Sequence, residues 1–459
     1  MAIFQLFKNR ICVLFFLMLQ LQFAFASKWT DRGMYDVSWY NASKSNFEIS
    51  NAKQLAGIAF LVNNGYTTFS GKTIKLVEDI SLKSNVWIPI GNTTYKFCGI
   101  FDGNNKDIRD LNINILSSES EHDIYGLFGY IKNAEIKDLY IYGDINFEIE
   151  DWYLKQYIGS ISAYAEKSKL CNVKSYVDVV YDRRHASNYN YNIYIGGLIG
   201  YGESNYIERC RYNAKLDAAI NKGTTLMDSE YYNDYSHFYV AGLCAYDKKS
   251  TYNYCESYIK DISMYLPGSK NGTMGISLGG IIAEALSSNI YSCKSVIFSG
   301  ELLYYTNKIV TLPFGGITDF HTISYGEGNI HNCYCIIYDL NFGTGSSKSK
   351  VSCGNICRNR DEYNQQRYSN NYSNEDASFT VHSLPFTKGY DGLTTFNRRE
   401  MFDQEFVDEL NLYYTLRGKN PIWELGPYPY YPQVNLNLST GIKNVDNKAD
   451  SIFKIIAVR

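Results

Sequence analysis

The chain has 459 residues, of which 45% are hydrophobic and 16% aromatic, and its formal net charge is −3. This length and apolar content exclude wholesale disorder, because such a chain can bury a sizeable core. Its 44 basic residues are balanced by 47 acidic ones, so it lacks the basic excess that is typical of nucleic-acid-binding proteins. The length fits about three domains or one elongated repeat array equally well.

A secretory signal peptide is predicted over residues 1–26. Two basic residues precede an apolar run from Ile11 to Phe23, and Ala24-Phe25-Ala26 has the small residues of a cleavage site. The run is short for a membrane span of about 20 residues, although an uncleaved anchor is the alternative. No later stretch is long and apolar enough to cross a bilayer. We therefore expect a mature chain that begins at Ser27 and is exported, with no transmembrane segment.

Residues 27–114 are predicted to form an N-terminal cap and opening coils. Residues 50–62 have the pattern of a short helix with Ser50 at its N-cap and Leu55 and Ile58 on one face. The segments WIPIG, from Trp87, and FCGIFDG, from Phe97, follow as turn and strand signals. Because the end of a repeat array exposes an unpaired edge, this region would cover it.

Residues 115–342 contain six copies of a motif in which small residues are flanked by large apolar ones. The copies read YGLFGY, GSISAY, GGLIGY, AGLCAY, GGIIAE and GGITDF, and they begin at Tyr125, Gly159, Gly196, Ala241, Gly279 and Gly315. Successive copies are 34, 37, 45, 38 and 36 residues apart. Each is followed by a short stretch of alternating apolar and polar residues, which indicates a β-unit rather than a helical repeat. We predict an all-β fold, a parallel right-handed β-solenoid with short helical caps at both ends.

The six motifs resemble the GLUG-motif repeats of bacterial surface proteins, which also occur beside some IgA-cleaving peptidases. The segments from Trp87 and Phe97 resemble the opening coils of such proteins in Bacteroides-like bacteria. The resemblance covers about residues 125 to 340 and implies a secreted or cell-surface protein of a Gram-negative bacterium. The later glycine of the motif is replaced by Ala163, Ala245, Ala283 and Asp319 in four copies.

The C-terminal third is predicted to contain three further parts. Residues 343–395, rich in Ser, Asn and charged residues, have the composition of a polar insert. Residues 396–436 are predicted to be a capping segment with an amphipathic helix over 401–411, in which Phe402, Phe406 and Leu410 share a face. The tail over 437–459 faintly resembles the start of a type IX secretion sorting domain, although too few residues follow for a complete one.

Five cysteines stand at positions that we take as equivalent in successive repeats, namely Cys171, Cys210, Cys255, Cys293 and Cys333. We favour a column of buried free thiols over disulfides, because free cysteine behaves as a small core hydrophobe. Disulfides remain the alternative in an oxidising compartment, and Cys353 with Cys357 is the pair best spaced for one. No CxxC pair exists, so no structural zinc site is expected.

Most catalytic signatures are missing from the sequence. HExxH and a Walker A loop are absent, and residues 343–349 have P-loop composition without its spacing. Residues 102–107 fit a tight turn better than a calcium loop. Asp319, His321 and His331 lie close together in sequence, but six histidines in the chain make such proximity common. We therefore predict no catalytic residue, metal ligand or cofactor.

Tyrosines are unusually abundant, with 43 in the chain, and they gather in the insertions between repeats. Insertions on one side of a solenoid commonly form its binding face, and tyrosine suits sugar or protein recognition. The candidate ligand-binding residues are Tyr189, Tyr191, Tyr232 and Tyr235. The alternative is that these rings only cover the edges of the coils.

The sequence thus favours a non-enzymatic, adhesin-like surface protein that binds a glycan or a protein. One alternative is a polysaccharide lyase or hydrolase with an unrecognised carboxylate site, and another is a structural surface component. Fold alone does not choose among these functions.

Overall fold

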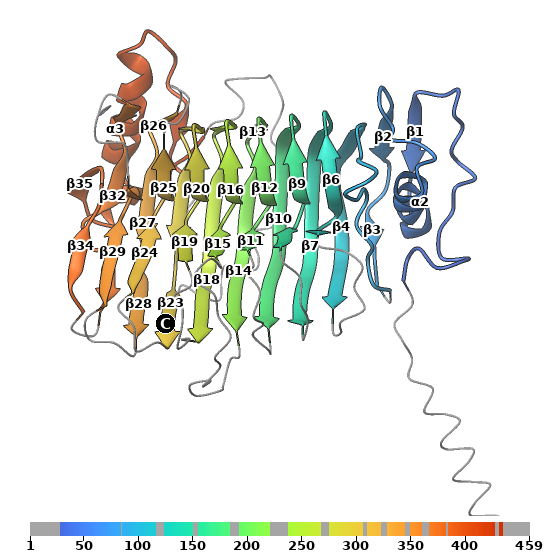
Figure 1. Cartoon of the computed structure of the whole chain (residues 1–459). Coiled ribbons are helices and arrows are strands. Elements are labelled where there is room, and N and C mark those ends of the chain that lie inside the picture. The colour runs from blue at the N-terminus through green and yellow to red at the C-terminus, as the bar shows by residue number, and fades with distance from the viewer. Residues whose placement is uncertain are drawn as a thin grey trace, which may run out of the picture.

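The computed structural model describes most of the chain between residues 28 and 434 (Figure 1). The described residues are 28–83, 85–115, 124–149, 155–183, 192–220, 237–267, 275–305, 310–322, 328–344, 349–359, 367–381, 384–426 and 431–434. The predicted signal peptide over 1–26 and the tail over 437–459 lie outside the described residues.

Three parallel sheets run side by side along the molecule. Sheet I consists of β5 (Ile124–Tyr125), β8 (Lys155–Gly159), β11 (Asn192–Gly196), β15 (His237–Ala241), β19 (Gly275–Gly279), β24 (Thr311–Gly315), β29 (Lys350–Gly354) and β34 (Phe386–Lys388). Sheet II consists of β6 (Phe128–Lys132), β9 (Ser162–Glu166), β12 (Ile199–Glu203), β16 (Cys244–Lys248), β20 (Ile282–Leu286), β25 (Thr318–Thr322) and β30 (Cys357–Asn359).

Sheet III is the largest and contains the longest strands. In chain order they are β1 (Asn46–Ile49), β2 (Thr73–Leu76), β3 (Ile80–Ser81), β4 (Ile100–Ile115), β7 (Glu135–Ile149), β10 (Lys169–Arg183), β13 (Tyr206–Glu208), β14 (Arg211–Ile220), β17 (Thr251–Asn253), β18 (Glu256–Pro267), β21 (Asn289–Tyr291), β22 (Lys294–Ile297), β23 (Gly300–Tyr305), β26 (Asn329–His331), β27 (Tyr334–Ile337), β28 (Asp339–Thr344), β31 (Tyr368–Ser369), β32 (Tyr372–Asn374), β33 (Ser378–Thr380) and β35 (Leu393–Phe396). The chain visits sheet I, then sheet II, then sheet III, and repeats this order. Sheet III contains shifts of register, for example between Ala214 and Lys215. The fold is therefore all-β and solenoid-like, as predicted.

The glycine motif forms the corner between sheets I and II. A Cβ added to Gly197 would lie 2.1 Å from the carbonyl oxygen of Gly242 in the next coil and 2.5 Å from the ring of Tyr212. Tyr212 is fully buried, and its one hydroxyl hydrogen is shared between the carbonyl oxygens of Lys215, at 2.6 Å, and Val177, at 3.1 Å. At Gly197 the next coil and the Tyr212 ring leave no room for a side chain, which explains the glycine at this corner. The equivalent positions in two other coils are Ser160 and Asn355, so the requirement is not the same in every coil.

In five coils the corner between sheets II and III contains no glycine. One residue per coil there has a positive φ between 49° and 59°, and these residues are Asn133, Lys167, Ser204, Lys249 and Ser287. A left-handed conformation is costly for residues other than Gly, Asn and Asp, so the stacked coils must impose it.

The core is one continuous apolar cluster inside the three sheets. Cys210, Cys255, Cys293 and Cys333 occupy one column of it, each fully buried. Cys171 does not belong to this column, because it pairs with Glu208 while Val173 pairs with Leu139. Every described cysteine is a free thiol, which includes Cys353 and Cys357. The preference for thiols over disulfides thus agrees with the structure, and the Cys353–Cys357 pair does not form.

Residues 343–395 are not an insert apart from the repeats. They contain strands β29 to β35, and β29 pairs with β24 from Thr311↔Lys350 to Gly315↔Gly354. Gly354, Asn355 and Ile356 therefore form one more sheet I to sheet II corner, which the polar composition of this segment obscured. The prediction of an insert is therefore wrong, and this segment is a further coil of the array.

Both predicted helices are present with shifted ends. α2 spans Ala52–Asn63, and its N-cap is Asn51 rather than Ser50, because the Asn51 side chain accepts from the amide of Gln54 at 3.0 Å. α3 spans Gln404–Thr415 and follows a short 3₁₀ turn, η2 (Glu400–Phe402). A small antiparallel pair, β36 (Trp423–Glu424) and β37 (Gln433–Val434), lies beside it.

The C-terminal segment packs on the flank of sheet III rather than only closing its end. Phe406 and Trp423 contact Tyr334 there, in a second apolar cluster separate from the main core. The buried Lys294 lies beneath, and its ammonium group donates to Glu256 at 2.8 Å and to the carbonyl oxygen of Pro432 at 3.0 Å. Besides the capping role predicted for it, the segment 396–436 therefore covers the flank of sheet III.

Replacement of Gly197 by alanine is expected to lower the free energy of unfolding by about 1–3 kcal/mol, because the new methyl group collides with backbone and a fixed ring. Chemical denaturation measures the change. Gly343→Ala is the control, since its Cβ would meet only the end of the Leu303 side chain at 2.8 Å. Equal losses in the two variants would contradict the role assigned to the corner.

Thiol labelling tests the cysteine assignment. Among the ten described cysteines, only Cys98 and Cys171 are partly exposed, and the other eight are buried. We expect those two to react with an aromatic disulfide reagent in the native protein, and the rest only after denaturation without a reductant. Fewer free thiols in denaturant would show that disulfides form after all.

Candidate functional site

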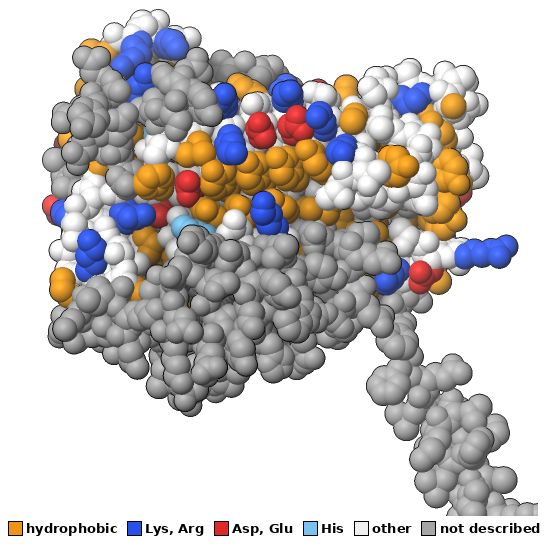
Figure 2. Space-filling model, in the orientation of Figure 1, with side chains coloured by type: hydrophobic (Ala, Val, Ile, Leu, Met, Phe, Trp, Pro, Cys, Tyr) orange, Lys and Arg blue, Asp and Glu red, His pale blue; other side chains and the backbone are white. Residues whose placement is uncertain are grey.

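Seven tyrosines form two adjoining columns on the outer face of sheets I and II, and we call this surface the tyrosine strip. Figure 2 shows a band of hydrophobic side chains across this face, with charged side chains along its edge. In the sheet II column, ring centroids are 4.5, 4.6 and 5.2 Å apart, and in the sheet I column they are 4.8 Å apart. The columns are Tyr130, Tyr164, Tyr201 and Tyr246 on sheet II, and Tyr157, Tyr194 and Tyr239 on sheet I.

Strand register places these rings one above another. Tyr164, Tyr201 and Tyr246 are the third residues of β9, β12 and β16 and pair directly with one another. A parallel sheet puts such residues about 4.8 Å apart, which is the spacing of stacked rings. In sheet II the second residue of these strands, for example Gly200, is not paired with the neighbouring strands, so the backbone is irregular at that point.

The glycine corner brings the two columns into contact. Between Tyr194 and Tyr201 the chain has only Gly196, Gly197 and Gly200 besides three buried apolar residues. The rings of Tyr194 and Tyr201 consequently meet edge to face, with centroids 5.8 Å apart and planes at 82°. Burial raises the pKa of six hydroxyl groups in the strip above its usual value, those of Tyr130, Tyr164, Tyr194, Tyr201, Tyr239 and Tyr246.

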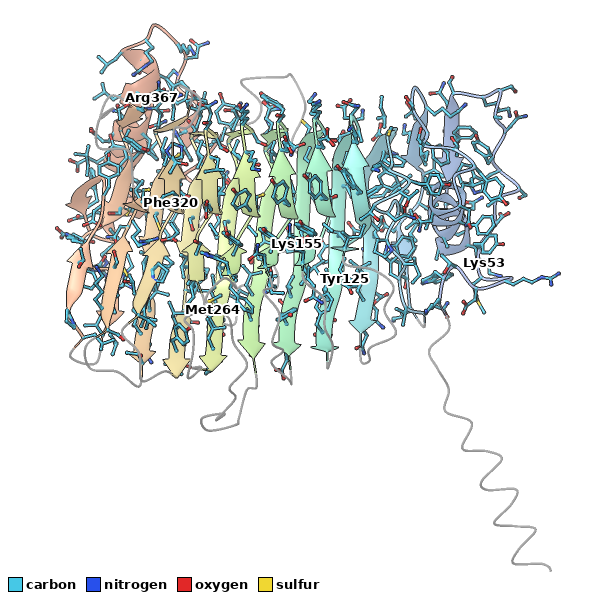
Figure 3. The ribbon with its side chains drawn as sticks, in the orientation of Figure 1. Lys53, Tyr125, Lys155, Met264, Phe320 and Arg367 are labelled. Carbon is cyan, nitrogen blue, oxygen red and sulfur yellow. The ribbon has the colours of Figure 1, made fainter. Side chains whose placement is uncertain are left out.

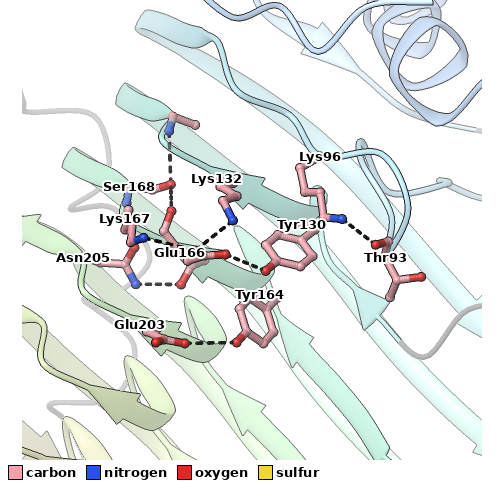
Figure 4. A network of polar contacts seen from close by, with 12 residues as sticks. Thr93, Lys96, Tyr130, Lys132, Tyr164, Glu166, Lys167, Ser168, Glu203 and Asn205 are labelled. Atoms are coloured by element: carbon pink, nitrogen blue, oxygen red, sulfur yellow. Dashed lines mark hydrogen bonds and ion pairs between the residues drawn. The ribbon is translucent and has the colours of Figure 1, made fainter. Parts of the chain in front are cut away.

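A row of charged residues runs beside the sheet II column at the fifth position of β6, β9, β12 and β16, and Figure 4 shows the first three, Lys132, Glu166 and Glu203. The Tyr130 hydroxyl donates to Glu166 at 2.9 Å, and Lys132 forms an ion pair with the same carboxylate at 2.9 Å. Burial alone would raise the pKa of Glu166, but the bonds from Lys132 and Tyr130 hold it below its usual value. Tyr164 donates to Glu203 in the same way, at 3.5 Å. Each hydroxyl in this part thus reaches the carboxylate of the next coil.

The strip is interrupted at the coil of β19 and β20. Ser277 pairs with Tyr239 in the sheet I column, and Glu284 pairs with Tyr246 in the sheet II column. Aromatic character returns one coil later at Phe320, which is labelled in Figure 3. A serine and a carboxyl group therefore occupy the two places where rings would otherwise stand.

The ring of His237 leans into the gap left in the sheet I column. It stacks on Tyr239 with centroids 4.1 Å apart, and its Nε2 lies 3.1 Å from the Ser277 hydroxyl. Room for it depends on Gly275, because a Cβ there would lie 2.2 Å from Nδ1 of His237. Burial, followed by the charge of Arg358, lowers the pKa of His237 to about 4.

Hydrogen bonds link this histidine to a buried ion pair. The Ser277 hydroxyl bonds to Asp319, whose carboxylate is fully buried and forms a two-pronged ion pair with Arg358. The chain of contacts is therefore His237, Ser277, Asp319 and Arg358.

Glu284 lies next to this network without joining it. No described residue hydrogen-bonds or forms an ion pair with its carboxyl group. Burial, followed by the charge of Asp319, raises the pKa of Glu284 to about 7, against the opposing charges of Arg358 and Lys248. The carboxyl group is thus both donor and acceptor at neutral pH.

The sequence placed the candidate ligand-binding tyrosines elsewhere. Tyr189, Tyr191, Tyr232 and Tyr235 all lie outside the described residues. The described strip was missed, although its signal was present: four motif copies end in a tyrosine that becomes the sheet II column. Asp319 and His321 do not come together as a reactive pair, because His321 is buried and bonds to Tyr368 and the Ser288 carbonyl oxygen. His331 contacts Ser369.

Comparisons with known proteins add little to the site. No protein-family model matches the chain, and no curated protein is significantly similar to it. A solved structure titled a putative immunoglobulin A1 protease from Bacteroides ovatus matches 86% of this chain and 93% of its own, with 15% identity and a TM-score of 0.39. Among the described residues, no helix is suited to span a membrane and no group of three or more His, Cys, Asp or Glu side chains is placed to hold a metal.

A pH series tests the environment of Glu284. Its folded-state pKa of about 7 exceeds the ordinary 4.5, so the folded protein binds more protons than the unfolded chain between these pH values. This carboxyl group therefore makes the protein less stable as the pH rises through that window.

Glu284→Gln removes the effect, so the melting temperature of the variant relative to wild type should rise from pH 5 to pH 8. Asp247, whose pKa burial raises to about 6, is present in both proteins and cancels in the comparison. Glu203→Gln is the control for loss of one negative charge from this face. A difference between Glu284→Gln and wild type that is constant with pH would contradict the assignment.

Proposed function

We propose that this chain is an exported cell-surface protein with a closed, right-handed β-solenoid that binds an extended glycan or protein along the tyrosine strip. The role is adhesin-like and needs no catalysis. The observation that carries the proposal is the strip itself, seven tyrosines placed in register on an outer face. The signal-like segment over 1–26 and the GLUG-like motifs support the location.

The strip favours a ligand that is itself extended and repetitive. Four successive coils present the same side chain at steps of 4.5 to 5.2 Å along sheet II. The rings hide their faces against each other and present edges and hydroxyl groups outward. Tyrosine provides rigid contact area and a hydrogen-bonding group at low entropic cost, which suits sugar or polypeptide chains.

A polysaccharide lyase or hydrolase is the second candidate, because two carboxyl groups from neighbouring coils interact at the end of the strip. Glu284 has the raised pKa of an acid catalyst, and Asp319 contributes to that rise. Asp319, however, is fully buried against Arg358 and would need to be uncovered to act on a substrate. The binding role therefore remains the better supported one.

The test is retention of purified residues 27–459 by a panel of polysaccharides, host glycans and surface proteins, with assay of shortened sugar products. A Tyr164→Ala, Tyr201→Ala double variant should bind about tenfold more weakly or worse, since it removes two adjoining rings. The control is the Tyr142→Ala, Tyr176→Ala variant, which removes a stacked pair with centroids 4.8 Å apart on sheet III.

Each outcome selects a function. Retention that depends on the strip but not on the sheet III pair supports the proposal, whereas product release supports the enzyme. Alanine at Tyr189, Tyr191, Tyr232 and Tyr235 tests the insertions separately, and loss of binding there alone would move the ligand off the strip. No retention by any member of the panel would leave a structural surface component.

A further inference from the structure

We propose that the interruption of the tyrosine strip is a subsite for a single uncharged pyranose unit, which stacks on the open face of Tyr246 and is hydrogen-bonded by Glu284. This inference rests on the proposed binding function and specifies its ligand class. The subsite places specific recognition at one coil, whereas the whole strip would contact several units of a long ligand.

Tyr246 differs from the other sheet II rings in what covers it. Tyr201 stacks on one face at 5.2 Å, but the residue next in register on the other side is Glu284. Lys248 does not cover that face, because its ammonium group is 5.6 Å from both the Tyr201 and the Tyr246 centroid and so lies beside the pair. At the far end of the column, by contrast, Lys96 lies over the ring of Tyr130 at 5.3 Å.

The sheet I column offers no equivalent face. His237 already stacks on the outer side of Tyr239 at 4.1 Å, where its ring takes the place of a fourth tyrosine. In the interrupted coil, the face of Tyr246 that is turned toward Glu284 therefore has no ring partner among the described residues, and the His237 and Ser277 pair lies in the adjoining column.

The charged groups around this face of Tyr246 are balanced in sign. Glu284 and Asp319 carry the acidic groups, Lys248 and Arg358 carry the basic ones, and His237 is neutral. A strongly anionic or cationic ligand would gain little from such surroundings. A hydroxyl-rich neutral ring suits them, because its C–H face can lie against the aromatic ring while its rim hydroxyls bond to a carboxyl group.

Glu284 is the group best placed to read those hydroxyls. It is half-buried, and none of the described side chains or backbone groups hydrogen-bonds to its carboxyl oxygens. Two hydroxyls of a sugar could bond to these oxygens. The neighbouring Ser277 hydroxyl is already engaged with His237.

The experiment uses residues 27–459 and an array of neutral hexasaccharides of glucose, xylose, mannose, galactose and N-acetylglucosamine, with surface proteins printed on the same array. We expect at least one hexasaccharide to be retained, and both Tyr246→Ala and Glu284→Ala to weaken its binding about tenfold or more. Glu135→Ala, which removes an acidic side chain from sheet III, is the matched control and should bind as wild type. Circular dichroism confirms that each variant is folded.

The remaining outcomes separate this inference from the proposed function. A hexasaccharide bound equally well by the Tyr246→Ala and Glu284→Ala variants, but lost from the Tyr164→Ala, Tyr201→Ala variant, overturns the subsite and keeps the strip. Retention of printed proteins alone overturns the sugar and keeps a binding function. No retention at all overturns both. Where a variant fails to fold, Glu284→Gln replaces Glu284→Ala and Tyr246→Leu replaces Tyr246→Ala, with the same expected losses.

Discussion

The spacing of parallel strands is the constraint on which this molecule depends. Each residue in a coil lies about 4.8 Å from its equivalent in the next coil, so every position in the repeat becomes a column of contacting side chains. A residue type is acceptable at a position only if it also tolerates a copy of itself, or a complement, on both sides. Small thiols meet this condition inside the sheets, and planar tyrosine rings meet it outside.

Columns of charged residues show how coils can stack even where identical side chains would repel one another. Arg211, Glu256 and Lys294 follow one another in register on sheet III, and their alternating signs make two ion pairs. Along the strip, Glu166 and Glu203 are adjacent like charges, and each accepts a tyrosine hydroxyl from the preceding coil. The first column is buried and its charges alternate in sign. The second column is partly exposed and contains neighbouring like charges, because repulsion between charges is weaker near solvent.

The repeat and its parallel β character could be predicted because they rest on spacing alone. The corner between sheets I and II carries glycines, so its position was visible, whereas the corner at Lys167, Ser204 and Lys249 has no residue that signals a left-handed turn. The coil at Gly354 was missed since its corner reads GNIC within a polar stretch. Cys171 was misplaced by two residues because strand register depends on pairing, which spacing from the glycine does not determine.

The site was harder to predict than the fold for a related reason. Tyr201 and Tyr246 are visible in the motif, but whether they face core or solvent depends on the irregular backbone at Gly200 and Ala245, which no alternation rule anticipates. The contribution of His237 is less visible still, since its ring occupies a neighbouring coil and needs the bare backbone of Gly275. In a stacked array the informative positions are thus those where the column changes residue. Uniform columns explain why the coils associate, while Ser277 and Glu284, which break two columns in the same coil, give this face its one point of distinct chemistry.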